Sequence, residues 1–223
     1  MTHVVSGGRQ RLDQFVLDIE FLLISVVQGV ALAALAGAAI GPISDLQYQY
    51  WLYIISAFLV IIIFWSQAII HALSFIDWPL DLMHNFLYFL ASFVEVLSFS
   101  KMTDPVHWFG FISALFVVAG ILYLVDLKLI KARQSQFSQS SEGEKLYTYV
   151  YHEHMFELKV LVPAGLIFNL AAFWLVRTYP NLFLDHNYHL ILIVIQVLFE
   201  MVVLVNAIKS FKIRSNLITH SVT

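Results

Sequence analysis

Long apolar stretches, separated by short polar segments, make up most of the chain. Six of them cover roughly residues 15–40, 50–73, 79–100, 106–127, 155–177 and 188–211. Each is as long as the ~20 residues that a helix needs to cross the hydrocarbon core of a bilayer. The pattern therefore predicts an all-α, polytopic integral membrane protein in which six transmembrane helices form a single domain over residues 1–223.

The positive charges lie almost entirely on one side of these stretches. Three segments share that side, because an even number of spans separates them: the N-terminal segment, the segment after the fourth span and the C-terminal tail. They carry Arg9, Arg11, Lys128, Lys131, Arg133, Lys145, Lys209, Lys212 and Arg214. The other side has Lys101 and Arg177. Short loops rich in Lys and Arg stay in the cytoplasm, so we expect both termini there.

Composition narrows the picture further. The chain is 60% hydrophobic and 12% charged, and six spans leave no room for a separate soluble domain. The absence of cysteine excludes disulfides, thiolate metal ligands and cysteine nucleophiles. A net charge of −3 does not suggest a nucleic-acid partner. The Ser- and Gln-rich part of residues 132–149 predicts a flexible cytoplasmic loop.

Local signals mark the ends of the spans on the side that has few positive charges. Asp104 followed by Pro105 is typical of a helix cap and first turn, at the start of the fourth span. Aromatic residues gather near the same side of the membrane, as expected of an interfacial belt. They are Tyr48, Tyr50, Trp51, Trp108, Trp174 and Tyr179.

Many ionisable residues fall on the cytoplasmic half of the spans. We interpret five of them as an acidic, histidine-containing vestibule that concentrates cations: Asp77, Asp81, His84, His154 and Glu157. Histidines there would respond to pH near neutrality. The alternative is that carboxylates in the first turns of helices are stabilised by the helix dipole alone.

A metal site is possible at this face, but the sequence does not require one. His154 and Glu157 are three residues apart and could share an ion with His71 or His84 from neighbouring helices. Since nothing in the spacing demands it, the sequence predicts no metal and no other cofactor.

Polar residues also occur within the spans. Asp18 lies inside the first span and is followed at helical spacing by Leu22, Ser25 and then small residues. Such a face either packs closely against another helix or lines a narrow pore. Glu95 and Glu200 are acids within the third and sixth spans, and an intramembrane acid is by default a functional candidate.

The first three spans resemble the transmembrane-protein-175 potassium channel family, six-helix channels without a TVGYG filter. The segment Arg11–Asp18 is similar to the family's Arg-x-x-x-Phe-Ser-Asp motif: Arg11 and Phe15 keep their spacing, the serine is missing and the aspartate falls one residue late. Phe64-Trp65 with His71, and the run Leu82–Leu90, are similar to the family's second and third helices.

The resemblance implies an ion channel assembled from several copies, with the first helix lining the pore. Its apolar gate would lie near Leu22, Leu23 and Val26, next to Ser25. Asp18 would hold a motif network with Arg11, Phe15, His71 and Asn85.

The sequence therefore predicts a homo-oligomeric channel in the lipid bilayer that conducts monovalent cations, potassium or protons. Three alternatives stay open. One is a membrane-embedded, metal-dependent enzyme that uses His71, His84 and His154. Another is a proton-coupled transporter that uses Glu200 and Glu95, for which the Pro163–Gly165 break in the fifth span is the one helix interruption. The last is a structural subunit whose polar groups only join helices.

Overall fold

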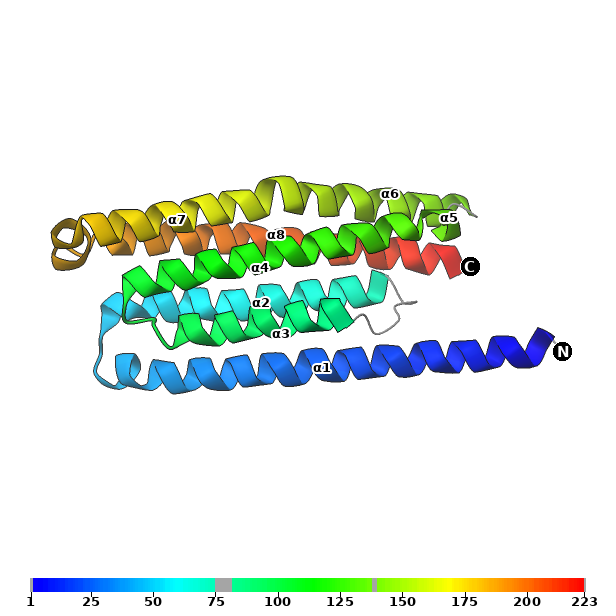
Figure 1. Cartoon of the computed structure of the whole chain (residues 1–223), viewed down its shortest axis with the longest axis horizontal. Coiled ribbons are helices and arrows are strands. Elements are labelled where there is room, and N and C mark those ends of the chain that lie inside the picture. Colours follow the sequence, from blue (N-terminus) through cyan, green and yellow to red (C-terminus); the bar gives the residue numbers. More distant parts are fainter. Residues whose placement is uncertain (1, 75–81, 138–139, 223) are drawn as a thin grey trace.

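The computed structural model describes residues 2–74, 82–137 and 140–222, with side chains for most residues from Asp18 onward. Within these ranges the chain forms helices that run side by side along one long bundle (Figure 1). Their order is α1 (Thr2–Ser44), η1 (Tyr48–Tyr50), α2 (Trp51–Ser74), α3 (Leu82–Phe99), α4 (Pro105–Ala132), α5 (Gln134–Phe137), α6 (Ser141–Phe156), η2 (Glu157–Leu161), α7 (Val162–Thr178), η3 (Asn181–Asp185) and α8 (His189–Val222).

The expectation of an all-α membrane protein is confirmed. Among the described residues, 5 helical segments are long and apolar enough to cross a membrane, and Met83–Phe99 is a shorter apolar helix. The long segments are Phe21–Ser44, Tyr48–His71, Pro105–Ala132, Gly143–Thr178 and His189–Ile218. Each overlaps one of the stretches expected from the sequence.

The two ends of the bundle differ in charge, as expected. Both termini lie at the same end, which we call the terminal end, while η1 and η3 lie at the opposite end (Figure 1). Lys101 follows α3 and Arg177 lies in the last turn of α7, both at the opposite end. The basic residues of α4, α6 and α8 lie toward the terminal end, so this charge distribution continues to favour a cytoplasmic location for it.

Aromatic packing forms the core toward the opposite end. Tyr53 and Trp108 are fully buried and meet edge to face, with ring centroids 5.4 Å apart. The interfacial position expected for Trp108 is therefore wrong: its indole faces inward, where it finds a hydrogen-bond acceptor. Trp174 and Tyr179 are exposed, as residues of a membrane interface should be.

The cap expected before the fourth span is confirmed. The backbone amide of His107 donates to Asp104 Oδ1 at 3.2 Å, and Pro105 occupies the first turn of α4. Asp104 has an extended backbone, and its carboxylate satisfies an amide that has no partner within the helix.

The expectation of a loop over residues 132–149 is wrong for most of that segment. It contains α5 and the first half of α6. Ser140 caps α6 by accepting a hydrogen bond from the amide of Gly143 at 3.0 Å. Leu146 and Val150, one turn apart, are buried with Ile130 of α4 in a small apolar cluster at the terminal end. The polar composition of the segment led to the prediction of a loop. One apolar residue per turn is nevertheless enough to hold a helix against its neighbours.

An irregular turn between α6 and α7 positions the candidate site. α6 passes into α7 through η2, a π-helical turn in which the amide of Val162 donates to the carbonyl of Glu157. Pro163 follows at once, and proline cannot donate to the preceding turn. The π-helical turn widens the helix by one residue, which changes the face on which the residues of α7 lie relative to those of α6. Such turns occur frequently at functional sites.

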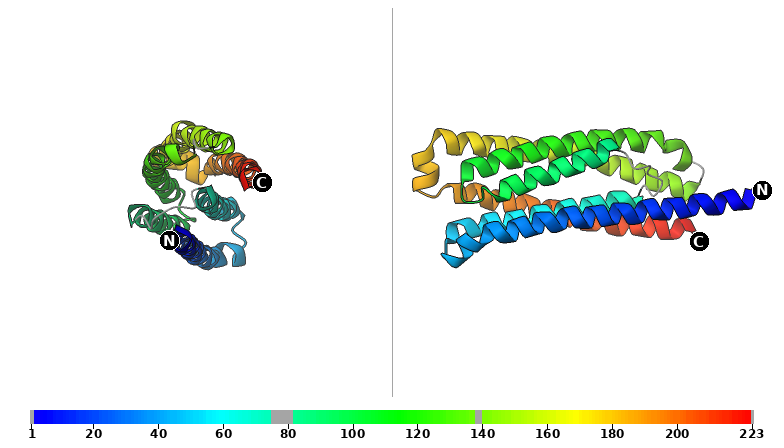
Figure 2. Two further views of the ribbon diagram at one scale, coloured as in Figure 1. Left: turned by 90° about the vertical axis from the view of Figure 1, so that its right-hand side faces the viewer. Right: turned by 60° about the horizontal axis from the view of Figure 1, so that its bottom comes forward.

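α1 lies at one side of the bundle (Figure 2). Its main contacts are with α2 and α3, and its buried residues Ala31, Leu35 and Ala39 face them. The opposite face of α1 is exposed in the single chain. In this arrangement α2 packs against α1 and α8, and α4 packs against α3 and α7.

Candidate functional site

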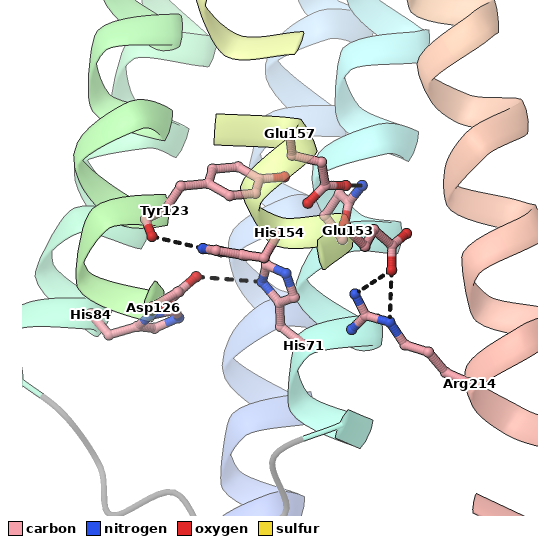
Figure 3. A network of polar contacts seen from close by, with 9 residues as sticks. His71, His84, Tyr123, Asp126, Glu153, His154, Glu157 and Arg214 are labelled. Atoms are coloured by element: carbon pink, nitrogen blue, oxygen red, sulfur yellow. Dashed lines mark hydrogen bonds and ion pairs between the residues drawn. The ribbon is translucent and has the colours of Figure 1, made fainter. Parts of the chain in front are cut away.

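A cluster of buried polar side chains lies in the half of the bundle near the terminal end. Five helical segments contribute to it: α2, α3, α4, α6 and η2 (Figure 3). We call it the histidine cluster and define it as Gln67, His71, His84, Tyr123, Asp126, His154 and Glu157. His71, Asp126, His154 and Glu157 are each at least nine-tenths buried.

Asp126 joins two histidines from different helices. Its Oδ1 lies 3.0 Å from Nδ1 of His84, and its Oδ2 lies 3.5 Å from Nδ1 of His71. The carboxylate comes from α4, and the histidines come from the last turn of α2 and the first turns of α3. Asp126 is thus hydrogen-bonded to His84 and lies within ion-pair distance of His71.

His154 and Glu157 lie on the same side of the helix, three residues apart across the junction of α6 with η2. His154 Nε2 is 2.7 Å from the backbone carbonyl of Tyr123. Gln67 donates from Nε2 to Glu157 Oε1 at 3.0 Å. The Tyr123 hydroxyl also points toward the Glu157 carboxylate (Figure 3). These contacts fix both side chains from α2 and α4.

A buried ion pair closes the cluster toward α8. Arg214 donates from Nη2 to Glu153 Oε2 at 2.8 Å and from Nε to the same oxygen at 3.1 Å. A guanidinium held at two points is well suited to a buried carboxylate, since it matches charge and hydrogen-bond geometry together. Arg214 is 3% exposed, so its side chain is part of the protein interior although the tail around it is basic.

A cavity of about 160 Å³ extends from the histidine cluster into the bundle. His71, His84 and Glu157 line it near the cluster, and Glu200 lines it deeper in the bundle. Most of the remaining wall is apolar, with Ile112, Leu115, Phe116, Leu122, Phe199 and Val203 among its side chains. The cavity thus connects two carboxylates through apolar surroundings.

Glu200 is the centre of a second hydrogen-bonded group. Ser56 donates to Glu200 Oε1 at 2.7 Å, and Gln196 donates from Nε2 to the same oxygen at 2.8 Å. Trp108 donates from Nε1 to Gln196 Oε1 at 3.3 Å. The other carboxylate oxygen of Glu200, Oε2, is buried without a hydrogen-bond partner. α2, α4 and α8 are therefore joined by polar contacts in the middle of the bundle.

A third polar contact lies toward the opposite end. The Tyr53 hydroxyl and His189 Nδ1 share a hydrogen bond of 3.0 Å between α2 and the first turn of α8. Both residues are buried. Polar side chains thus occur inside the bundle at the histidine cluster, at Glu200 and at this pair.

Most of the residues expected to line a pore on the first helix lie on the outer face of α1. Leu22 and Val26 are 65% and 56% exposed, and Ser25 is exposed beside them. Of the expected gate, Leu23 lines the interior cavity. Leu22, Ser25 and Val26 therefore face away from the bundle of a single chain, and Leu23 does not.

The expected motif network around Asp18 includes residues whose side chains are not described, so only part of it can be located in the structure. Asp18 is exposed, and His71 faces Asp126 instead. Asn85 lines the cavity, and the side chains of Arg11 and Phe15 lie outside the described ones. Glu95 is fully buried on α3 but is not part of the cavity wall.

Three of the five residues expected to form the vestibule lie in the buried histidine cluster. His84, His154 and Glu157 come together, while Asp77 and Asp81 lie outside the described residues. Sequence reasoning missed the roles of Gln67 and Tyr123. Their signal was helical spacing: Gln67 is one turn before His71, and Tyr123 is one turn before Asp126.

The chain matches no protein-family model, no curated protein and no solved structure.

Proposed function

We propose that this protein moves a cation across the membrane through the interior of its own helical bundle. The observation that carries the proposal is that Glu157 and Glu200 face one cavity, and each has a buried carboxylate oxygen without a hydrogen-bond partner. An acid inside a membrane protein is costly, and such acids are typical of ion pathways and proton relays.

The spacing along α8 supports a path rather than an isolated site. Three polar residues of α8 lie at different depths: His189 pairs with Tyr53, Glu200 lines the cavity, and Arg214 lies beside the histidine cluster. They are 11 and 14 residues apart along the helix (200 − 189 and 214 − 200). At about 1.5 Å per residue they span roughly 37 Å along the helix. That distance exceeds the roughly 30 Å of the hydrocarbon core, so polar groups occur at both borders and in the middle.

The apolar wall between the two acids supplies a barrier. A cation that leaves Glu157 meets aromatic and aliphatic side chains before it reaches Glu200, so passage requires a rearrangement or hydration of the cavity. The π-helical turn at Glu157–Leu161 and Pro163 give the fifth span a place to bend. Interrupted helices beside a central binding site are typical of secondary transporters.

The test is ion flux into liposomes that contain the purified protein, with a potassium gradient and a proton-uptake dye. We expect protein-dependent proton uptake, and Glu200→Gln should reduce it at least tenfold. Glu95→Gln is the matched control, because Glu95 is an equally buried acid that does not line the cavity. Absence of flux of potassium, sodium and protons through folded protein would refute transport. Unchanged flux in Glu200→Gln would refute this path.

A second candidate is a pore formed by α1 in an oligomer. The exposure of Leu22, Ser25 and Val26 on a single chain favours it, since these side chains are free to meet those of other copies. The chain has no cysteine, so Ser25→Cys on α1 and Ala119→Cys in the cavity can be compared directly. A positively charged thiol reagent should block flux only in the variant whose cysteine lines the path.

A further inference from the structure

We propose that His71, His154 and Glu157 bind a divalent transition-metal ion such as Zn²⁺. One ligand atom from each of the three residues lies within 4.8 Å of the others. The residues come from α2, α6 and η2 and are all buried. The site concerns binding and does not depend on the proposed transport.

The hydrogen bonds of these residues point to a ligand. Each side chain has one polar atom that meets a protein group and one buried atom that has no hydrogen-bond partner. The atoms without a partner are Nε2 of His71, Nδ1 of His154 and Oε2 of Glu157. A buried polar atom left without a partner costs about 1–3 kcal/mol, and three of them in one place need a common explanation. A cation satisfies all three at once.

The second polar atom of each proposed ligand faces a protein group of the kind that supports metal ligands. A metal-bound histidine usually directs its second nitrogen to a carboxylate or a backbone carbonyl, which fixes the ring and its tautomer. Here Asp126 faces Nδ1 of His71 at 3.5 Å, and the carbonyl of Tyr123 faces Nε2 of His154 at 2.7 Å. Gln67 holds the second oxygen of Glu157 at 3.0 Å.

The distances fit an ion after a small closure. Zinc bonds of about 2.1 Å in a tetrahedral site place ligand atoms roughly 3.4 Å apart, so atoms 4.8 Å apart need to approach by about 1.4 Å. The His71 and His154 ring centroids are 5.7 Å apart, so the two imidazoles are neighbours at the proposed site. The wide π-helical turn at Glu157 is a natural place for that adjustment.

Charge balance also favours a divalent ion. Glu157 and Asp126 are two buried carboxylates in the histidine cluster, and an ion of charge +2 would balance both. Arg214 is engaged by Glu153. Two imidazoles and one carboxylate suit zinc, cobalt and similar ions, whereas calcium and magnesium prefer oxygen ligands alone. Three protein ligands beside a cavity leave a fourth position for water or another small ligand.

The test is Co²⁺ titration of the untagged, chelator-treated full chain in detergent, followed by visible absorption. Tetrahedral Co²⁺ absorbs far more strongly than the octahedral aqueous ion. We expect one equivalent to bind with this strong absorption and Zn²⁺ to displace it. Zn²⁺ should also raise the unfolding temperature, because an ion that binds only the folded state stabilises it.

The variants separate the ligands from their supports. Asp126→Asn removes a supporting group and should weaken Co²⁺ binding about 10–100-fold. Glu157→Gln and His154→Asn remove ligands and should weaken it more. His152→Asn is the matched control, because His152 lies on the same helix but is exposed. It should bind as the original chain does.

Two results would overturn the proposal. One is that the folded original chain binds no stoichiometric Co²⁺ and gains no stability from Zn²⁺, a result that does not depend on how any variant folds. The other is that Glu157→Gln and His154→Asn, eluting as folded protein, bind Co²⁺ as tightly as His152→Asn. Because the titration uses no membrane gradient, its failure leaves the transport proposal intact, and absence of flux leaves the metal site intact.

Discussion

Gln67 of α2 holds the carboxylate of Glu157 at the first residue of the π-helical turn, through a hydrogen bond of 3.0 Å. The two residues are 90 positions apart in the chain, so this contact exists only because α2 packs beside the junction of α6 and α7. It joins the irregular turn to the rest of the histidine cluster and therefore bears on both proposals.

The first prediction concerns this contact. Gln67→Leu removes the donor and leaves Glu157 with a second unsatisfied oxygen, which should cost about 1–3 kcal/mol of unfolding free energy. It should also weaken Zn²⁺ binding by about 10–100-fold, since Gln67 orients a proposed ligand. Unfolding in mixed detergents and Co²⁺ titration measure the two effects. A variant that matches the original chain in both assays would contradict this role.

The second prediction concerns a glycine between α7 and α4. A Cβ at Gly165 would clash with the ring of Phe116, a residue of the cavity wall. Gly165→Ala must therefore displace the ring, and we expect a cost of about 1–3 kcal/mol together with altered flux. Gly29→Ala is the control, because a Cβ there meets nothing within 4 Å.

The double variant Gly165→Ala with Phe116→Leu should recover part of the lost stability, because a smaller side chain leaves room for the new methyl group. The double-variant cycle would show coupling between the two positions. Additive effects would mean that Gly165→Ala acts through something other than the Phe116 ring.

The third prediction concerns the buried tryptophan. Trp108→Phe keeps most of the aromatic packing but removes the donor to Gln196, so it should destabilise the fold by about 1–3 kcal/mol. Trp174→Phe is the control, since Trp174 is 63% exposed and should change stability by less than about 0.5 kcal/mol. Fluorescence should also differ: loss of Trp108 removes a buried emitter, and loss of Trp174 an exposed one. Equal destabilisation by both variants would argue against a buried role.

The fourth prediction concerns orientation in the membrane. The cysteine-free chain allows single cysteines to be placed at Ser141, near the terminal end, and at His186, near the opposite end; both positions are exposed. In intact cells, a thiol reagent that does not cross membranes should label His186→Cys and leave Ser141→Cys unlabelled until the membrane is opened. The reverse pattern would place the termini outside the cell.

The long apolar stretches determined the fold class without any tertiary information. A run of about 20 apolar residues has few stable arrangements other than a membrane-spanning helix, and so six spans, their order and the charge difference between the two ends follow from local composition. The cap at Asp104 and Pro105 is also local, because a side chain and an amide three residues apart must meet once the helix forms.

The neighbours of each polar residue were decided only by helix packing. Helical spacing places His154 and Glu157 on one side of a helix, but it does not tell which helices lie opposite, so Gln67 and Tyr123 could not be found as their partners. The inward position of Trp108 and the packing of Leu146 and Val150 against α4 have the same origin. In a chain where nearly every face of every helix is apolar, hydrophobic periodicity no longer marks the buried face, and close packing makes that choice.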